Sequence, residues 1–143
     1  MGKERFLVKS FGDNIEGTRI GLAKLLELLA HHQHAVIVVP TIGQVKGTLL
    51  EKVLGEKLSK KLINDRVLDL DDGKKISLCG HATLKNYSNA DVYLVLWGTK
   101  LMIADIEKLL GWKAVVLVTW LKADCEEWEK SYPVQVIYDD KKG

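Results

Sequence analysis

The sequence predicts a three-layer α/β domain with a doubly wound, mostly parallel β-sheet. Short runs that are apolar at nearly every position, as expected of strands buried on both faces, alternate with longer segments of helical spacing. Such alternation is typical of βαβ units, which place parallel strands in one sheet and helices on both of its faces. The chain has 143 residues, of which 47% are hydrophobic, and this is enough for one core and hardly for two. We therefore expect a single domain over residues 1–143.

Five apolar runs rich in β-branched residues predict the parallel strands of the core. They lie at residues 6–8, 35–39, 92–96, 114–118 and 134–138. One further stretch breaks the alternation, because residues 66–70 and 75–79 flank the sequence Asp-Asp-Gly-Lys. Asp-Gly between two short apolar runs favours a tight hairpin turn. We therefore expect a small β-hairpin insertion near residues 66–79.

Four segments of helical spacing separate the strands. Leucine-rich apolar faces predict one helix at about residues 18–32 and another across residues 49–62. A third apolar stripe covers residues 103–110 and is followed by Gly111, a residue typical of helix C-caps. A fourth helix is expected from about residue 124 up to Pro133, because the acidic residues at its start favour the N-terminal end of a helix dipole.

Charge and composition exclude several classes of protein. The net charge is only +2, from 21 basic and 19 acidic residues, so no strong field draws the chain to nucleic acid or to a membrane. No apolar run reaches the roughly 18 residues that a membrane span needs. Cys79 and Cys125 match no zinc or redox spacing, which predicts two free thiols and a cytoplasmic protein. His31, His32 and His34 lie at a helix end, where polar residues cap carbonyls, so we expect no metal site there.

The segment after the first predicted strand has the frame of a phosphate-binding loop. Gly12 and Gly17 have the Gly-x4-Gly spacing between a strand and a helix that this motif requires. Thr18 occupies the position of the motif's lysine, however, and Arg19 that of its magnesium-binding hydroxyl. Two interpretations stay open. The segment is either a plain strand-to-helix turn, or a loop that binds a flavin or nucleotide phosphate through backbone amides in a flavodoxin-like or Rossmann-like protein.

The other strand ends carry little catalytic chemistry. The predicted strands run into Val-Pro-Thr at 39–41, Cys-Gly-His-Ala-Thr at 79–83, Trp-Gly-Thr-Lys at 97–100 and Thr-Trp at 119–120. None of these ends has a carboxylate that would hold a metal or act as a base, so we expect no metal, no cofactor and no catalytic residue. His81 is the one imidazole among them, and the sequence places no carboxylate or cysteine partner beside it.

In order and spacing, these segments resemble the first RecA-like domain of superfamily-2 helicases, especially the DEAH-type and flavivirus-like RNA helicases. The Gly-x4-Gly loop opens a leucine-rich helix, and Val-Pro-Thr is similar to the family's motif Ia. Residues 76–84 resemble the Cys-His-Ala-Thr segment of the motif Ib region, with Gly80 as an additional residue. Residues 91–96 resemble the strand that precedes Asp-Glu-Ala-His, and residues 114–123 fall where Ser-Ala-Thr-Leu-Asp-Ala is expected. The likeness covers residues 6–139.

The chain departs from the family at the positions that carry its chemistry. Trp97 and Gly98 stand where the family has acidic residues of Asp-Glu-Ala-His, and Trp120 replaces the threonine of Ser-Ala-Thr. The loop lysine is missing as well. The resemblance therefore implies a RecA-like P-loop topology without helicase chemistry, in a module that works by binding RNA, a protein partner or copies of itself.

The family's contacts with the nucleic-acid backbone carry over to Thr41, His81 and Thr83 by resemblance, and Lys85 lies close to them in sequence. Affinity for phosphates scales with the basic contacts made, so the small net charge predicts weak RNA binding. The two strand-end tryptophans offer a second mode of binding. Exposed, they would anchor a partner, and buried, they would fill the vacated nucleotide position.

The order of the strands separates the two interpretations. The helicase resemblance implies that the first strand lies between residues 114–119 and 134–138, with 92–97 and then 35–40 beyond. A flavodoxin-like order instead places the first strand between residues 35–40 and 92–97.

Overall fold

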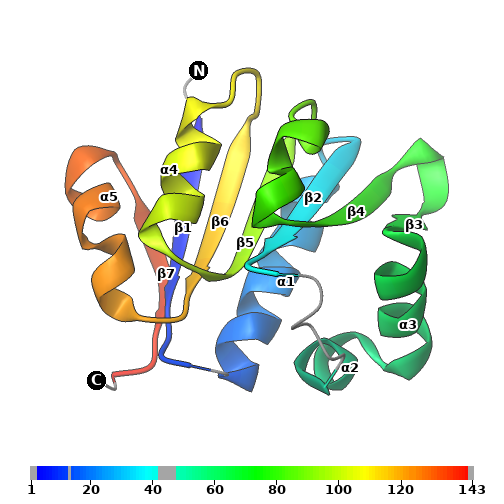
Figure 1. Ribbon diagram of the computed structural model, residues 1–143, viewed down its shortest axis with the longest axis horizontal. Helices are drawn as coiled ribbons and strands as arrows, with labels where there is room; N and C mark the ends of the chain where they lie inside the picture. The colour runs from blue at the N-terminus through cyan, green and yellow to red at the C-terminus, as the bar shows by residue number, and fades with distance from the viewer. Residues whose placement is uncertain (1–2, 13, 42–47, 142–143) are drawn as a thin grey trace.

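The computed structural model describes residues 3–12, 14–41 and 48–141, and within them one seven-stranded β-sheet forms the centre of the molecule (Figure 1). The strands are β1 (Glu4–Lys9), β2 (His34–Val39), β3 (Val67–Asp69), β4 (Lys75–Gly80), β5 (Val92–Gly98), β6 (Ala114–Thr119) and β7 (Gln135–Asp139). Their order across the sheet is β3-β4-β2-β5-β6-β1-β7. Every neighbouring pair is parallel except β3 with β4, so the sheet is mostly parallel, as predicted.

The position of β1 decides between the two expected strand orders. β1 pairs with β6 on one side and with β7 on the other, and β5 and then β2 lie beyond β6. This is the order in which residues 114–119 and 134–138 flank the first strand. The flavodoxin-like order is wrong, because β2 pairs directly with β5 and leaves no place for β1 between them.

The predicted hairpin is present, but it belongs to the main sheet. β3 and β4 pair in antiparallel fashion, and the backbone N–H of Leu70 donates to the Lys74 carbonyl at 2.8 Å across the turn. Asp72 and Gly73 supply the positive φ angles, 64° and 74°, that the turn needs. β4 also pairs in parallel with β2 along its whole length, because it is apolar on both faces. The sheet therefore has six parallel strands within the described residues, and not the expected five.

Helices cover both faces of the sheet (Figure 1). They are α1 (Ile15–Leu29), α2 (Thr48–Leu54), α3 (Glu56–Asp65), α4 (Lys100–Lys108) and α5 (Glu126–Ser131), with short 3-10 helices η2 (Asp71–Gly73), η3 (His81–Tyr87) and η4 (Lys122–Cys125). Residues of α1, α2 and α3 form one hydrophobic core cluster with one face of the strands. Residues of η3, α4 and α5 form a second cluster with the other face. The arrangement has the three layers that the sequence predicts.

The first helix begins three residues earlier than expected because of a local cap. The Asn14 side chain accepts a hydrogen bond from the Gly17 N–H at 2.8 Å, which satisfies one of the free donors at the start of α1. The helix therefore begins at Ile15 and ends at Leu29, before the three histidines. His34 is already the first residue of β2.

Two other helix predictions are corrected by glycine geometry. The single helix expected across residues 49–62 is two helices, because Gly55 between α2 and α3 has a φ of 91°, outside the helical range. α4 ends at Lys108, and the residue after it is extended, so Gly111 is not its C-cap. Leu110, expected on the apolar stripe of this helix, lies beyond its end and is 86% exposed.

Both cysteines are buried and unpaired, as predicted. Burial raises the pKa of the Cys79 thiol to about 12 and also raises the pKa of Cys125, so neither is a thiolate at neutral pH. No helix among the described residues is long and apolar enough to cross a membrane.

Candidate functional site

The carboxyl ends of the six parallel strands meet along one edge of the sheet, at the bottom of Figure 1. In open α/β sheets this edge is where ligands bind. The segments that reach it are the loop between β1 and α1, the ends of β2, β5 and β6, the start of η3, and residue 140 after β7. The Gly-x4-Gly frame and both strand-end tryptophans are therefore at the same edge, as the sequence predicts. Asp13, inside that frame, lies outside the described residues.

The backbone donors at the start of the loop are already occupied. The Phe11 N–H donates to the Asp140 carboxylate at 2.8 Å, and the Gly12 N–H donates to the Trp120 carbonyl at 2.8 Å. The Asp140 side chain is only 2% exposed, and it pairs with the Lys122 ammonium at 2.5 Å. These contacts raise the pKa of Lys122, with the hydrogen bond to Asp140 as the largest cause. A carboxylate of the chain itself thus takes the place that a bound phosphate would need.

Two of the backbone donors at the start of α1 are occupied as well. The Gly17 N–H is bound by the Asn14 side chain, and the Thr18 N–H donates to the Asn14 carbonyl at 3.0 Å. Gly17 has a packing reason of its own, because a Cβ there would lie 2.9 Å from Cβ and Oγ of Ser10. The glycine at this position is therefore explained by close packing, without any phosphate.

A direct hydrogen bond joins two positions, Thr18 and Trp97, that the helicase resemblance assigns to the nucleotide and its metal. The Trp97 indole N–H donates to Oγ1 of the buried Thr18 at 3.2 Å. Trp97 has a φ of 54°, unusual for a bulky residue, and its ring packs against the core cluster beneath α1. Gly98 lacks room for a side chain, because a Cβ would lie 2.6 Å from two core side chains. Arg19 points away from this space and pairs with Glu16 at 2.8 Å on an exposed surface.

The second strand-end tryptophan borders an open pocket of about 410 Å³. Trp120 is 43% exposed and Leu121 beside it is 47% exposed. The pocket is lined by Pro40, Thr41, Trp97, Thr99, Trp120, Leu121 and Asp124. We call it the carboxyl-edge pocket. The two tryptophans thus differ in their surroundings, since Trp97 is hydrogen-bonded to Thr18 and packs against the core, whereas Trp120 is more accessible.

The residues that the helicase resemblance assigns to nucleic acid follow two neighbouring strands. Thr41 follows β2, and His81 begins η3 directly after the neighbouring strand β4. Thr83 and Lys85 lie further along η3, and Thr41, Thr83 and Lys85 are exposed. The structure therefore places Thr41 and His81 at the ends of adjacent strands, with Thr83 and Lys85 along the helix that follows.

The expectation that His81 has no carboxylate partner is wrong. Its Nε2 forms a hydrogen bond with the Asp105 carboxylate at 2.6 Å, and α4 supplies this aspartate from 24 residues away. The bond to His81 is the main cause that lowers the pKa of Asp105, with Lys108 at 3.5 Å as a further contact. The sequence shows no sign of the pair, because it depends on how α4 packs over the sheet.

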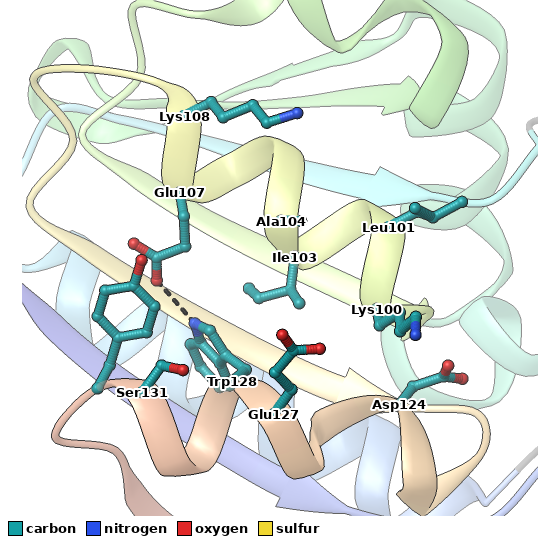
Figure 2. Close-up of a pocket in the computed structure, with 11 residues that line it drawn as sticks. Lys100, Leu101, Ile103, Ala104, Glu107, Lys108, Asp124, Glu127, Trp128 and Ser131 are labelled. Carbon is teal, nitrogen blue, oxygen red and sulfur yellow. Dashed lines mark hydrogen bonds between the residues drawn. The ribbon is translucent and has the colours of Figure 1, made fainter.

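A second pocket of about 410 Å³ lies between α4 and α5 (Figure 2). At one end of it the Glu107 carboxylate accepts hydrogen bonds from Arg5 Nε at 2.7 Å and Arg5 Nη2 at 2.9 Å, and from the Trp128 indole at 2.7 Å. The Arg5 guanidinium also stacks on the Tyr132 ring, 4.2 Å from its centroid. The ionised groups of this network satisfy one another, which identifies it as structural support for α4 and α5.

Among the described residues, no group of three or more histidine, cysteine, aspartate or glutamate side chains is placed to hold a metal ion. No significant match to this chain was found among protein-family models, curated proteins or solved structures.

Proposed function

We propose that this chain is a non-catalytic RecA-like domain, of the kind found first in superfamily-2 helicases, that binds a partner protein at the carboxyl edge of its sheet. The strand order supports the helicase resemblance, because β1 lies between β6 and β7 with β5 and β2 beyond. The observation that carries the proposal is the set of internal hydrogen bonds made by the loop between β1 and α1. Its donors bind Asp140, Asn14 and a carbonyl of the chain, and the Trp97 indole occupies the position beside Thr18.

The same closure argues against the flavodoxin-like or Rossmann-like alternative. A flavin or nucleotide phosphate held without a lysine needs free backbone N–H groups at the start of the first helix. At this helix the Gly17 and Thr18 N–H groups are used by Asn14, and before it the Phe11 and Gly12 N–H groups are used by Asp140 and the Trp120 carbonyl. The Asp140 carboxylate adds a negative charge that would repel a phosphate. A binding role without nucleotide agrees better with these contacts.

A protein segment fits the carboxyl-edge pocket better than RNA does. The pocket is mostly apolar and presents an accessible tryptophan, the residue type most enriched among the dominant contacts of protein interfaces. On the RNA side, the Asp105 carboxylate is hydrogen-bonded to His81 and places negative charge beside one of the expected backbone contacts. We therefore favour an apolar side chain of a partner, inserted beside Trp120.

Peptide selection tests this assignment. We expect a phage-displayed peptide library to enrich ligands whose dissociation constants rise at least tenfold, about 1.4 kcal/mol, with Trp120→Ala, because the indole is a large and accessible part of the pocket's apolar lining. Leu110→Ala is the matched control, since it removes an exposed apolar side chain away from the pocket and should change affinity less than twofold. Enriched peptides that bind both variants equally would place the binding surface elsewhere.

RNA binding is expected to be weak and without sequence preference. Fluorescence anisotropy of single-stranded oligonucleotides at two salt concentrations should give dissociation constants no tighter than about 1 µM, weakening as salt rises. Lys85→Gln should change them only slightly, because it removes a single basic contact and affinity for phosphates scales with the number of such contacts. Nanomolar binding at physiological salt would contradict the preference for a protein partner and make Lys85, Lys100 and the lysines of residues 57–61 part of an RNA surface.

A further inference from the structure

Arg66 is an arginine with a buried guanidinium nitrogen that no side chain or carbonyl of the described residues binds. It follows α3 at the β3–β4 edge of the sheet (Figure 1), and its Nη1 atom is buried. Nη1 has no hydrogen-bond partner among the described residues. Burying part of a guanidinium without an acceptor is costly, so a buried unpaired donor in a native protein calls for a physical explanation.

The backbone at this position makes the choice of arginine more unusual. Arg66 has a φ of 65°, in the left-handed region that glycine or asparagine adopts most easily. Hydrogen bonds hold the backbone on both sides: the Arg66 N–H donates to Leu62 at 2.9 Å, and the Arg66 carbonyl accepts from the Leu78 N–H at 2.8 Å. Glycine would relieve the backbone and remove the unmatched charge. The backbone conformation therefore does not account for arginine at this position, and a role of the guanidinium accounts for it better.

Arg66 is one of the residues that line a separate pocket of about 500 Å³ between the end of β4 and η3. Its other lining residues are Leu78, Cys79, Thr83, Asn86 and Tyr87. None of these described residues carries a carboxylate, and the high pKa of the buried Cys79 thiol keeps it neutral. Asn86 is exposed and has an amide that donates two hydrogens. The pocket thus combines a positive charge and an amide donor with an apolar wall.

We infer that this pocket binds the oxyanion of a small molecule, a phosphate or a carboxylate, through Arg66 and Asn86. Arginine recognises both groups, because its planar guanidinium donates parallel hydrogen bonds to two oxygens. The volume admits a small organic molecule attached to the anionic group, with Leu78 and the Tyr87 ring as its apolar surroundings. The site is separate from the carboxyl-edge pocket and does not depend on the proposed function.

Thermal unfolding with inorganic phosphate, methyl phosphate or acetate tests the site, with sodium chloride used to match ionic strength. For a dissociation constant of about 1 mM, 10 mM ligand should raise the wild-type midpoint by about 5 °C. Arg66→Gly, whose backbone suits glycine, should lose this rise while remaining folded. Asn86→Ala should reduce it. Lys130→Gln removes one charge from an exposed position on α5 and should keep the full rise.

The three ligands also identify the chemistry. A rise with the phosphates alone, with acetate alone, or with both, each lost in Arg66→Gly, supports the site and tells which oxyanion it prefers. A rise of equal size in wild type and Arg66→Gly would be a general salt effect and would overturn the assignment. No rise in the wild-type protein, together with an unshifted Arg66 Nε–H signal in nitrogen-15 NMR titrations, would overturn it as well.

Discussion

Glu107→Ala is expected to destabilise the protein by about 3 kcal/mol, because it removes the shared acceptor of a largely buried charge network. The Arg5 and Glu107 side chains are 11% and 10% exposed. Without the carboxylate, the Arg5 guanidinium keeps its burial but loses two hydrogen bonds. The Trp128 indole N–H loses the acceptor shown in Figure 2. The network joins β1, α4 and α5, so its loss should loosen the whole helical layer on that side.

Urea unfolding at pH 7 measures the change in the free energy of unfolding. A double-mutant cycle with Arg5→Ala separates the Arg5–Glu107 interaction energy from the other effects of each substitution. The double variant should be much less destabilised than the sum of the two single variants, because neither charge is then left unpaired. Glu56→Ala, which breaks an exposed pair with Lys60 on α3, is the matched control and should leave the midpoint almost unchanged. Additive effects of Arg5→Ala and Glu107→Ala would show that the network contributes no coupling.

The same network predicts a pH dependence with a defined sign. Burial alone would raise the pKa of Glu107, but the hydrogen bonds from Arg5 and Trp128 outweigh it and hold the pKa below the ordinary value of 4.5. Because the pKa of Glu107 is lower in the folded protein than in the unfolded chain, the ionised carboxylate stabilises the folded state fully above about pH 4.5. This stabilisation is lost as the pH falls through the pKa of the folded state. The stability difference between wild type and Glu107→Ala should therefore shrink below pH 4.5 and stay constant between pH 6 and 8.

The fold follows from the sequence to a large extent because its strands are apolar on both faces. Such runs mark the inner strands of a parallel sheet, and all five were placed within a few residues of their observed bounds. The predicted hairpin is present too, but the sequence does not predict the parallel pairing of β4 with β2. A turn signal identifies the two strands that it joins, and it does not identify the strand that pairs with the other edge of the hairpin. The early start of α1 was missed because it depends on the Asn14 cap.

The candidate site follows from the sequence only in part. The strand ends were correctly placed at one edge, because parallel strands share a direction. The contacts that close the site were not predictable, since Asp140 is 129 residues from Phe11 and Trp97 is 79 residues from Thr18. Sequence spacing carries no signal for such pairs. Arg66 was missed for a different reason: its unusual feature is a missing partner, and that is visible only once the surrounding side chains are placed.

Neither ATP nor GTP is expected to bind measurably or to be hydrolysed. Phosphoryl transfer in this kind of fold needs a loop lysine on the phosphates, magnesium held by a hydroxyl and a carboxylate, and a group that orients water. By the proposed helicase resemblance, Thr18, Trp97 and Gly98 stand at the matching positions, and the first two are hydrogen-bonded to each other. Losing one transition-state contact commonly lowers the rate by about 10²–10³-fold, so losing several should leave no measurable turnover.

Isothermal titration with Mg-ATP should accordingly show no micromolar binding, and phosphate release should equal the buffer blank. Asp140→Ala offers a sharper version of the test. It removes the carboxylate that occupies the Phe11 N–H, so any nucleotide affinity held back by that contact alone should emerge in this variant. We expect hydrolysis to stay absent even so, because the variant restores neither the lysine nor a magnesium ligand. Turnover above the blank that is abolished by Arg19→Ala would contradict the prediction and indicate an enzyme. The Arg19 guanidinium would then have to leave Glu16 and contact the phosphates.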